Sequence, residues 1–330
     1  MAHRQHPIGS GFTAASTAAE VLAGVDLSGT YAIVTAGHAG IGREVTRALA
    51  AAGARVTVGA RDAGRAEEGL AGLVAEGAAA GVEVGQLDLL DPASVDGFVG
   101  RWLAADRPLH MLINCAGLPV PATRECDARG YEAQFAVNHL GHFQLTRGLH
   151  AALRAARGAR VVNVSSGAQR FGEIRWDDLH FDSGYDPLAA YAQSKLANVL
   201  HAVELDRRWA GDGIRGYAAH PGVIVGTALN SAAGAESLRE QGLIDEAGRP
   251  VIDPELGKKT PQQGAGTIAF GAASPLLDGI GGVYLKDCDV SRLDDEPRPL
   301  TADSVPSEAT SRAIDPVSAE RLWAVSERLL

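Results

Sequence analysis

Lysine, cysteine and aromatic residues are scarce in this chain of 330 residues. Four lysines stand against 26 arginines, and Phe, Trp and Tyr together make up 5% of the sequence. The three cysteines have no metal-ligand spacing and form no disulfide framework, so we expect reduced thiols in a cytoplasmic protein and no metal site. No run of about 18 apolar residues is present, and the first residues lack the apolar stretch of a signal peptide. We therefore expect no membrane-spanning helix and no export.

Net positive charge is also absent. The formal net charge is −10, which argues against binding to nucleic acid or to an anionic membrane surface. An anionic ligand would need basic residues gathered locally. Hydrophobic residues make up 46% of the chain, which is enough for a large core, and the length suits one large α/β domain or two small ones. We expect a small-molecule substrate rather than a nucleic-acid partner.

Short apolar runs alternate with helical patterns along most of the chain. The apolar runs show no polar alternation, as is typical of strands buried on both faces of a parallel sheet. Strands separated by helices predict βαβ units. The fold class is therefore α/β, with a single doubly wound Rossmann-type parallel sheet of about seven strands and helices on both faces. The expected strands are 31–35, 55–59, 82–87, 109–114, 160–164, 214–220 and 283–285, and the expected helices are 40–52, 63–79, 92–105, 123–157 and one that carries Tyr191.

Three segments are expected. Residues 1–29 form an N-terminal arm that packs on the main domain. Residues 30–286 form the Rossmann-type catalytic domain, and within it the polar stretch 226–260 could cover a substrate as a lid. Residues 287–330 form a C-terminal tail, which begins as a charged, irregular surface excursion and ends in an amphipathic helix.

Tyr191 and Lys195 are the first candidates for chemistry. Asp186 and Pro187 just upstream are typical of a helix start, and on that helix the two side chains lie one turn apart on one face. An ammonium group beside a phenol lowers the pKa of the phenol from its usual value of about 10, so Tyr191 could exchange a proton with a substrate oxygen. The other interpretation is a chance pair on a solvated helix, although composition predicts a Tyr-x-x-x-Lys only about 0.07 times.

Polar or glycine-rich segments follow six successive strands. In a parallel sheet the carboxyl ends of the strands meet at one edge, where ligands bind. The first segment opens a helix, and its backbone N–H groups could hold a pyrophosphate. The six segments are Thr35–Gly42, Arg61, Asp88, Asn114–Gly117, Ser165–Ser166 and His220–Gly222.

Together these motifs resemble the short-chain dehydrogenase/reductase family, over roughly residues 28–290. The resemblance also rests on Asn138 within Val137-Asn138-His139 and on the Tyr-x-x-x-Lys motif. Each motif alone is weak, and the set is strong. The sequences of residues 138–143 and 194–200 are most similar to those of the branch that holds retinol dehydrogenases and WW-domain oxidoreductases.

The resemblance implies a mechanism. Tyr191 would be the acid/base that protonates a carbonyl oxygen, while Lys195 would lower the pKa of Tyr191 and bind the nicotinamide ribose. Ser166, rather than its neighbour Ser165, would donate to the substrate oxygen, although both serines could simply end a strand. Asn138 would hold a water that links Lys195 to bulk solvent, or it could be only a helix N-cap.

The resemblance also implies a nicotinamide cofactor. A guanidinium at Arg61, just after the second strand, suits the 2′-phosphate of NADP(H), so we favour NADP(H) over NAD(H). In the alternative, Arg61 is merely solvated and Asp62 binds the ribose. The expected cofactor-binding residues are Thr35, Gly37, His38, Gly40, Ile41, Gly42, Arg61, Asp88, Leu89, Asn114, Ala116, Gly117, Tyr191, Lys195, Pro221, Gly222 and Val223.

Two positions depart from the family pattern, and the histidines form no set. Ala36 stands where the family has the first glycine of the turn, and its methyl group could weaken cofactor binding. One extra residue precedes Thr227, so Thr227 could miss the nicotinamide amide. Histidines near the motifs have no ligand-like grouping, and we interpret them as structural or surface residues. They are His38, His139, His142, His180 and His220.

The expected activity is the NADP(H)-dependent interconversion of a carbonyl compound (ketone or aldehyde) and an alcohol on a small to medium apolar substrate. The alternatives are an epimerase or dehydratase of the same fold that retains its cofactor, and a non-catalytic NADP(H)-binding protein. The long stretch from Ser166 to Tyr191 could cover helices that compact family members use for tetramer contacts, so we expect a monomer or small homo-oligomer. Apolar residues could wall a substrate pocket or merely cover the sheet: Leu118, Val120, Phe171, Trp176, Leu179 and Phe181.

Overall fold

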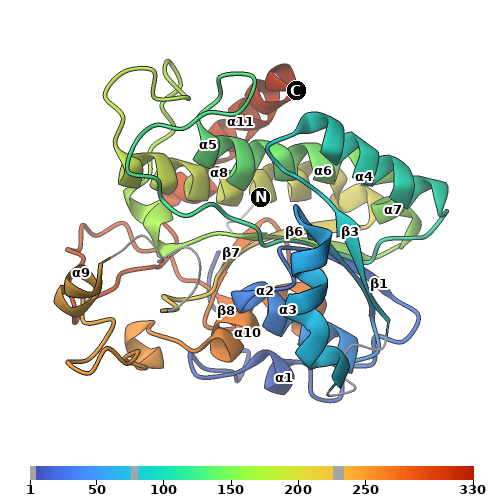
Figure 1. Cartoon of the computed structure of the whole chain (residues 1–330), viewed down its shortest axis with the longest axis horizontal. Helices are drawn as coiled ribbons and strands as arrows, with labels where there is room; N and C mark the ends of the chain where they lie inside the picture. Colours follow the sequence, from blue (N-terminus) through green and yellow to red (C-terminus); the bar gives the residue numbers. More distant parts are fainter. Residues whose placement is uncertain (1–4, 76–80, 226–233) are drawn as a thin grey trace.

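One mostly parallel sheet of eight strands organises the chain (Figure 1). The computed structural model describes residues 5–75, 81–225 and 234–330. The strand order is β3-β2-β1-β4-β5-β6-β7-β8, and only the last pair, β7 with β8, is antiparallel. The strands are β1 Tyr31–Thr35, β2 Arg55–Ala60, β3 Val82–Gln86, β4 Met111–Asn114, β5 Ala159–Val164, β6 Ile214–His220, β7 Val283–Lys286 and β8 Asp289–Val290.

Helices cover both faces of the sheet (Figure 1). On one face lie α1 Ala18–Val21, α2 Gly40–Ala51, α3 Ala63–Ala75 and α10 Pro261–Ala273. On the other lie α4 Pro92–Ala104, α5 Ala133–Phe135, α6 His142–Gly148, α7 His150–Ala155, α8 Pro187–Trp209 and α11 Pro316–Leu329. The doubly wound Rossmann-type fold is therefore confirmed, with the seven expected strands and one short strand, β8, that the sequence analysis missed.

The helices expected over about 123–157 are present, but the first of them starts later than predicted. An Asx-type turn precedes it, in which the Asp127 carboxylate accepts the N–H groups of Arg129 and Tyr131. The helical region begins only after Glu132, which caps α5. It then passes through a π-helical turn, Ala136–Gly141, before α6 and α7. Single π-helical turns are common at functional sites, and this one contains Asn138.

The N-terminal arm packs beside β7 and β8. The Gln5 amide donates to the carbonyl of Tyr284 and accepts the Tyr284 N–H, both at 2.8 Å, so it pairs with β7 as a neighbouring strand would. The Asp289 carboxylate accepts the N–H groups of Ile8, Gly9 and Ser10.

The first part of the C-terminal tail is irregular and mostly exposed over residues 292–304, as the sequence predicts, but it is anchored by a buried side chain. The Arg170 guanidinium is buried and donates to the carbonyls of Asp294 and Glu296. Gln169 donates to the carbonyl of Glu308 at 2.7 Å. A buried guanidinium needs several acceptors, and the carbonyls of this polar segment supply them, which draws the segment onto the sheet edge.

The expected lid falls partly outside the described residues. Residues 226–233, with Thr227, belong to the undescribed part, so the contact of Thr227 with a nicotinamide stays a prediction. The described remainder contains the short helix α9 Ala235–Glu240 and a 3-10 turn, Pro254–Leu256.

Candidate active site

The expected catalytic tyrosine and lysine lie on one helix whose start matches the prediction. Asp186 caps α8 by accepting the N–H groups of Leu188 and Ala189 at 2.8 and 2.9 Å, and Pro187 occupies the first turn. Lys195 Nζ lies 5.6 Å from the centre of the Tyr191 ring and donates to the carbonyl of Val164 at 3.2 Å. The ammonium group therefore faces the ring at the carboxyl end of β5.

Burial acts on the pKa values of both Tyr191 and Lys195. Burial raises the pKa of Tyr191, and a hydrogen bond with the Ser166 side chain opposes the rise. Burial lowers the pKa of Lys195 to about 8, with the nearby Cys115 acting weakly in the other direction. The expected lowering of the Tyr191 pKa by Lys195 stays a prediction, and the hydrogen bond with Ser166 favours the phenolate as well.

The structure separates the two adjacent serines. The Ser165 hydroxyl is buried and donates to the carbonyl of Lys195 at 2.8 Å, so it joins β5 to α8. The Ser166 side chain is half-buried, accepts the N–H of Ala168 at 3.2 Å and contacts Tyr191. Ser166 is therefore placed for chemistry, while Ser165 is structural.

Asn138 is fully buried in the π-helical turn, and its side chain is bound within the protein. Its amide donates to Gln134 Oε1 and Ser194 Oγ, both at 2.9 Å, and its oxygen accepts the N–H of Leu118 at 3.2 Å. Asn138 thus ties the loop after β4 to α8. The expected role of holding a water for Lys195 stays a prediction, and these three contacts show a bracing role in addition.

The glycine-rich turn has the close approaches that make glycine necessary. A Cβ at Gly37 would lie 2.6 Å from Thr46 Oγ1, and one at Gly42 would lie 2.5 Å from the Ala36 carbonyl. Ala36 itself has φ +54°, a left-handed conformation that favours glycine. Helix α2 begins after this turn without a side-chain cap and without an acidic residue in its first turn. Its uncapped N–H groups and positive dipole end suit a bound pyrophosphate.

Thr35 ends β1 but uses its hydroxyl inside the protein. Thr35 Oγ1 accepts the N–H groups of Cys115 and Ala116 at 2.8 and 2.9 Å. It lies 2.9 Å from His142 Nε2. His142 Nδ1 donates to the Asn138 carbonyl at 3.1 Å, and burial lowers the His142 pKa to about 4. Nε2 is then the unprotonated nitrogen and accepts the Thr35 O–H. The hydroxyl positions the turn at 114–117, and no direct cofactor contact follows from it.

The expected cofactor contact of Asn114 stays a prediction, and its side chain lies in the core. Its amide donates to Thr146 Oγ1 at 3.1 Å and to Asn163 Oδ1 at 2.8 Å. Asn163 donates in turn to the carbonyl of Asn198 on α8, and Asn198 donates to the carbonyl of Val164. This buried ladder, Asn114–Asn163–Asn198, was missed from the sequence. The available signal was an asparagine, Asn163, inside an otherwise apolar strand.

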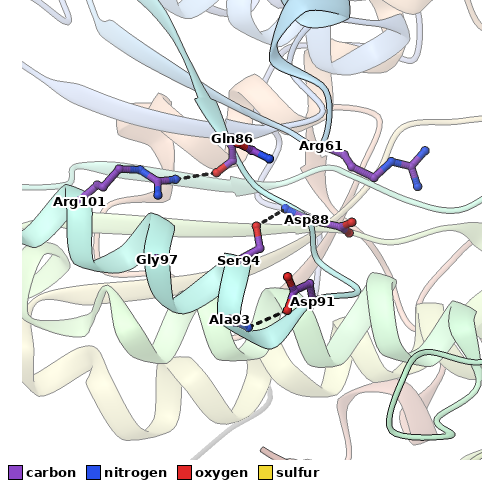
Figure 2. A pocket seen from close by; sticks show the side chains of 8 residues that line it. All are labelled: Arg61, Gln86, Asp88, Asp91, Ala93, Ser94, Gly97 and Arg101. Atoms are coloured by element: carbon purple, nitrogen blue, oxygen red, sulfur yellow. Dashed lines mark hydrogen bonds between the residues drawn. The ribbon is translucent and has the colours of Figure 1, made fainter.

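A polar cavity lies at the carboxyl ends of β2 and β3 (Figure 2). It has a volume of about 430 Å³. Arg61 and Asp88 extend to the same side of it (Figure 2). Among the described residues, the Arg61 guanidinium has no hydrogen-bond or ion-pair partner. The lining residues are Arg61, Gln86, Asp88, Asp91, Ala93, Ser94, Gly97 and Arg101.

Asp62 and Asp88 are both committed to local turns. The Asp62 carboxylate accepts the N–H of Arg65 at 3.0 Å at the start of α3. The Asp88 carboxylate accepts the N–H of Leu90 at 3.0 Å. Leu89 is buried and its carbonyl closely faces Gly141, where a Cβ would lie 2.4 Å away. One oxygen of Asp62, Oδ1, is therefore occupied by the cap of α3.

The last expected cofactor segment is a tight turn after β6. Gly222 has φ +89°, and a Cβ there would lie 2.8 Å from the Gly257 carbonyl. The Val223 N–H already donates to Gly257 O at 2.8 Å, and the Val223 carbonyl accepts the N–H of Lys259 at 3.0 Å. Val223 is thus at the expected place beside Pro221 and Gly222, with its backbone groups paired to the segment 257–259.

The described residues contain neither a metal-binding group nor a membrane-spanning helix. In residues 5–75, 81–225 and 234–330, no three His, Cys, Asp or Glu side chains come close enough to hold a metal ion. None of the helices in that part of the chain combines the length and hydropathy needed to cross a bilayer. Burial raises the pKa of Cys115 to about 11, so this thiol is unreactive.

A family model described as short chain dehydrogenase matches residues 30–237. A probable oxidoreductase of Streptomyces lividans is 45% identical over 303 residues, covering 91% of this chain and 97% of that protein. Retinol dehydrogenase 12 of Mus musculus is 37% identical and covers 93% and 88% of the two chains. The WW domain-containing oxidoreductase of Pongo abelii is 34% identical and covers 97% and 72%.

Solved structures agree with the sequence relatives. A protein of Mycobacterium paratuberculosis, titled as putative and uncharacterized, is 31% identical with a TM-score of 0.68, covering 96% of this chain and 97% of its own. A putative NAD(P)-dependent gluconate 5-dehydrogenase of Beutenbergia cavernae, titled as holding NADP at low occupancy, is 29% identical with a TM-score of 0.61, covering 79% and 96%. The chain belongs to the short-chain dehydrogenase family and is an NAD(P)-dependent oxidoreductase. The expected branch, that of retinol dehydrogenases and WW-domain oxidoreductases, is confirmed.

Proposed function

We propose that the protein interconverts a carbonyl compound and an alcohol with NADP(H), on a small to medium apolar substrate. The observation that carries the proposal is the contact between Ser166 and Tyr191 beside the buried Lys195. Such a set serves proton exchange with an oxygen and stabilisation of the charge that develops on it.

The residues of the chain have separate tasks in this proposal. When bound, the nicotinamide supplies or accepts the hydride. Tyr191 gives a proton to the carbonyl oxygen in reduction and removes it from the alcohol in oxidation. Ser166 donates a hydrogen bond to the same oxygen and lowers the pKa of Tyr191. Lys195, with a pKa of about 8, is mostly protonated near pH 7 and holds positive charge beside the ring.

The choice of NADP(H) rests on the cavity at β2 and β3. Arg61 offers an unpartnered guanidinium, and Asp62, the rival ribose ligand, caps α3. A guanidinium binds a phosphate with two parallel hydrogen bonds. The related structure titled with bound NADP points the same way.

The proposed substrate is apolar because of the relatives and the local composition. A 37% identical relative carries the name of retinol, an apolar alcohol. In this chain Phe171, the last residue of the 3-10 turn that follows Ser166, is 52% exposed. All-trans-retinal and nonanal are suitable first probes for the reductive direction.

Three further proposals concern the domain, the location and the assembly of the protein. We place residues 30–286 in one catalytic domain, the protein in the cytoplasm, and the assembly at a monomer or small homo-oligomer. Helix α11 supports the last point, since Trp323 packs edge-on against Phe143 and Ser326 binds His139, so α11 covers helices that would otherwise be free to meet another chain.

The first test is a titration of the purified protein with NADPH and with NADH, followed by nicotinamide fluorescence. The proposal expects tight NADPH binding and at least about tenfold weaker NADH binding, because only NADPH carries the phosphate for Arg61. Equal affinities for NADPH and NADH would contradict the NADP(H) assignment. If the protein bound neither cofactor, the proposed cofactor site would be refuted.

A further inference from the structure

Two strand ends are joined by a hydrogen bond just beyond the proposed catalytic serine. Gly167 follows Ser166 and begins a 3-10 turn, Gly167–Phe171. The Gly167 N–H donates to His220 Nδ1 at 3.1 Å. The regular pairing of β5 with β6 ends at Val164 and Ala219, so His220 continues the connection one step further with its side chain.

His220 is fixed as a hydrogen-bond acceptor. Burial lowers its pKa to about 3, with Asp287 and Glu308 opposing and Lys259 and Lys286 assisting the decrease. The ring is 4% exposed. It is therefore neutral under ordinary conditions, and the nitrogen that accepts the Gly167 N–H carries no proton.

The Gly167 peptide also lies against Ser307 of the C-terminal tail, and Tyr284 connects Ser307 with His220. The Tyr284 ring stacks on His220 with centroids 6.5 Å apart and an interplanar angle of 10°. The Tyr284 hydroxyl donates to the Ser307 carbonyl at 3.0 Å. Ser307 lies so close to Gly167 that a Cβ there would be 2.8 Å from Ser307 Cβ. The Gly167 peptide is thus held between His220 and Ser307, and no larger residue fits at that position.

We propose that His220 is a positioning residue for the reaction: by accepting the Gly167 N–H, it keeps the Ser166 hydroxyl against the Tyr191 phenol. This inference rests on the proposed function. His220 acts through the Gly167 peptide, and its removal frees the residue that follows Ser166. A displacement of about 1 Å at a reacting group can cost about 100-fold in rate.

The test compares His220→Leu with His220→Asn. Leucine fills the site without an acceptor, whereas asparagine places Oδ1 near the position of Nδ1. In His220→Leu, kcat for NADPH-dependent reduction of nonanal should fall about 10- to 100-fold, with NADPH affinity within about twofold of the wild type. His220→Asn should recover most of the rate.

The pH profile supplies a readout that a merely structural role would not move. Reduction needs the Tyr191 phenol, so kcat/KM falls as pH rises through the pKa of Tyr191. The Ser166 hydrogen bond lowers that pKa. In His220→Leu the falling limb should therefore shift to higher pH, and in His220→Asn it should return toward the wild-type position.

His110 offers a matched control at the amino end of β4, away from the carboxyl ends where the proposed site lies. Its Nδ1 also accepts a backbone N–H at 3.1 Å, from Tyr31, and its ring also stacks on the tyrosine, at 6.4 Å and 22°. Burial lowers the pKa of His110 as well. His110→Leu should lower stability but leave the pH limb where it is.

Three outcomes would overturn the inference. A wild-type pH limb in an active His220→Leu enzyme would show that Ser166 keeps its place without His220. A loss of NADPH affinity in proportion to the loss of rate would show that His220 acts through the Pro221–Gly222 turn instead. Unchanged hydrogen exchange at Gly167 in His220→Leu would show that the hydrogen bond does not hold the peptide. Failure of the wild type to reduce any carbonyl probe would instead refute the proposed function first.

Discussion

The two sides of the site differ in whether certain polar groups are free or are hydrogen-bonded within the protein. At the ends of β1 to β3 the uncapped start of α2 and the Arg61 guanidinium have no protein partner among the described residues. At the ends of β4 to β6, Asn138, Ser165 and Asn163 are buried and hydrogen-bonded to other parts of the protein. The first side is built to receive an anionic ligand, and the second is built to hold side chains still.

The difference has a physical reason. A group that binds a ligand must leave its hydrogen-bonding capacity free in the protein, and exposure to water makes this inexpensive. A proton-transfer group works only if its distance to the substrate is fixed. The closed side, at the ends of β4 to β6, therefore fixes the geometry of Tyr191 and Lys195. The open side, at the ends of β1 to β3, supplies the affinity for the cofactor.

Tyr191→Phe separates the two sides most strongly. Loss of the phenol removes the acid/base, so kcat should fall by about 10³-fold or more, while NADPH affinity stays within about twofold because the open side is untouched. Steady-state rates and a fluorescence titration measure both. Tyr185→Phe is the matched control, since it also removes a buried hydroxyl, one without a partner among the described residues, and it should keep its activity. Substantial turnover by Tyr191→Phe would take this residue out of the acid/base role.

Asn163→Ala removes hydrogen bonds in the interior of the closed side. It leaves the Asn114 amide and the Asn198 carbonyl without this partner, and such buried groups cost about 1–3 kcal/mol each. The free energy of unfolding in urea should fall by about 2–3 kcal/mol. Thr57→Val in β2 is the control, because the Thr57 hydroxyl donates to the carboxylate of Glu83 in β3, a side chain that is 53% exposed. It should cost less than about 1 kcal/mol, and equal losses at the two positions would remove the contrast.

Arg61→Ala tests the open side directly. NADPH should bind about tenfold or more weakly, since a charged hydrogen-bond donor to phosphate is lost, and NADH should bind almost unchanged. Arg101→Ala changes the same cavity, where the Arg101 guanidinium donates to the Gln86 carbonyl. This control should affect NADPH and NADH alike. An equal effect of Arg61→Ala on both cofactors would refute the 2′-phosphate assignment.

Ala36→Gly is the smallest change. Ala36 has φ +54°, a conformation that costs a residue with a side chain about 1 kcal/mol relative to glycine. The variant should gain about 0.5–1 kcal/mol in the free energy of unfolding. Ala51→Gly, in the ordinary helical conformation at the end of α2, should instead lose a similar amount. A loss in both variants would mean that Ala36 is unstrained.

Local patterns in the sequence predict most of the fold and the outline of the site. Apolar runs predicted seven strands to within one or two residues, because strands buried on both faces need continuous apolar surface. The capped start of α8 followed from Asp186 and Pro187. Residues that follow each strand predicted one common edge, because parallel strands end together.

Features that depend on distant partners could not be predicted in this way. The ladder through Asn114, Asn163 and Asn198 joins two strands and a helix, and no local pattern marks it. The same holds for His220, whose partner Gly167 lies 53 residues away in the sequence. The anchoring of the tail also depends on a distant partner, because the buried Arg170 donates to the carbonyls of Asp294 and Glu296.

The most direct test of the account is the transfer of deuterium from NADPH deuterated at the reactive nicotinamide carbon. The wild-type protein is incubated with this cofactor and nonanal or all-trans-retinal, and the alcohol is examined by mass spectrometry and NMR. Hydride transfer from the cofactor should leave one deuterium on the carbinol carbon for each cofactor oxidised. Tight NADPH binding with no deuterated alcohol from either probe, and with the cofactor returned unchanged, would contradict it.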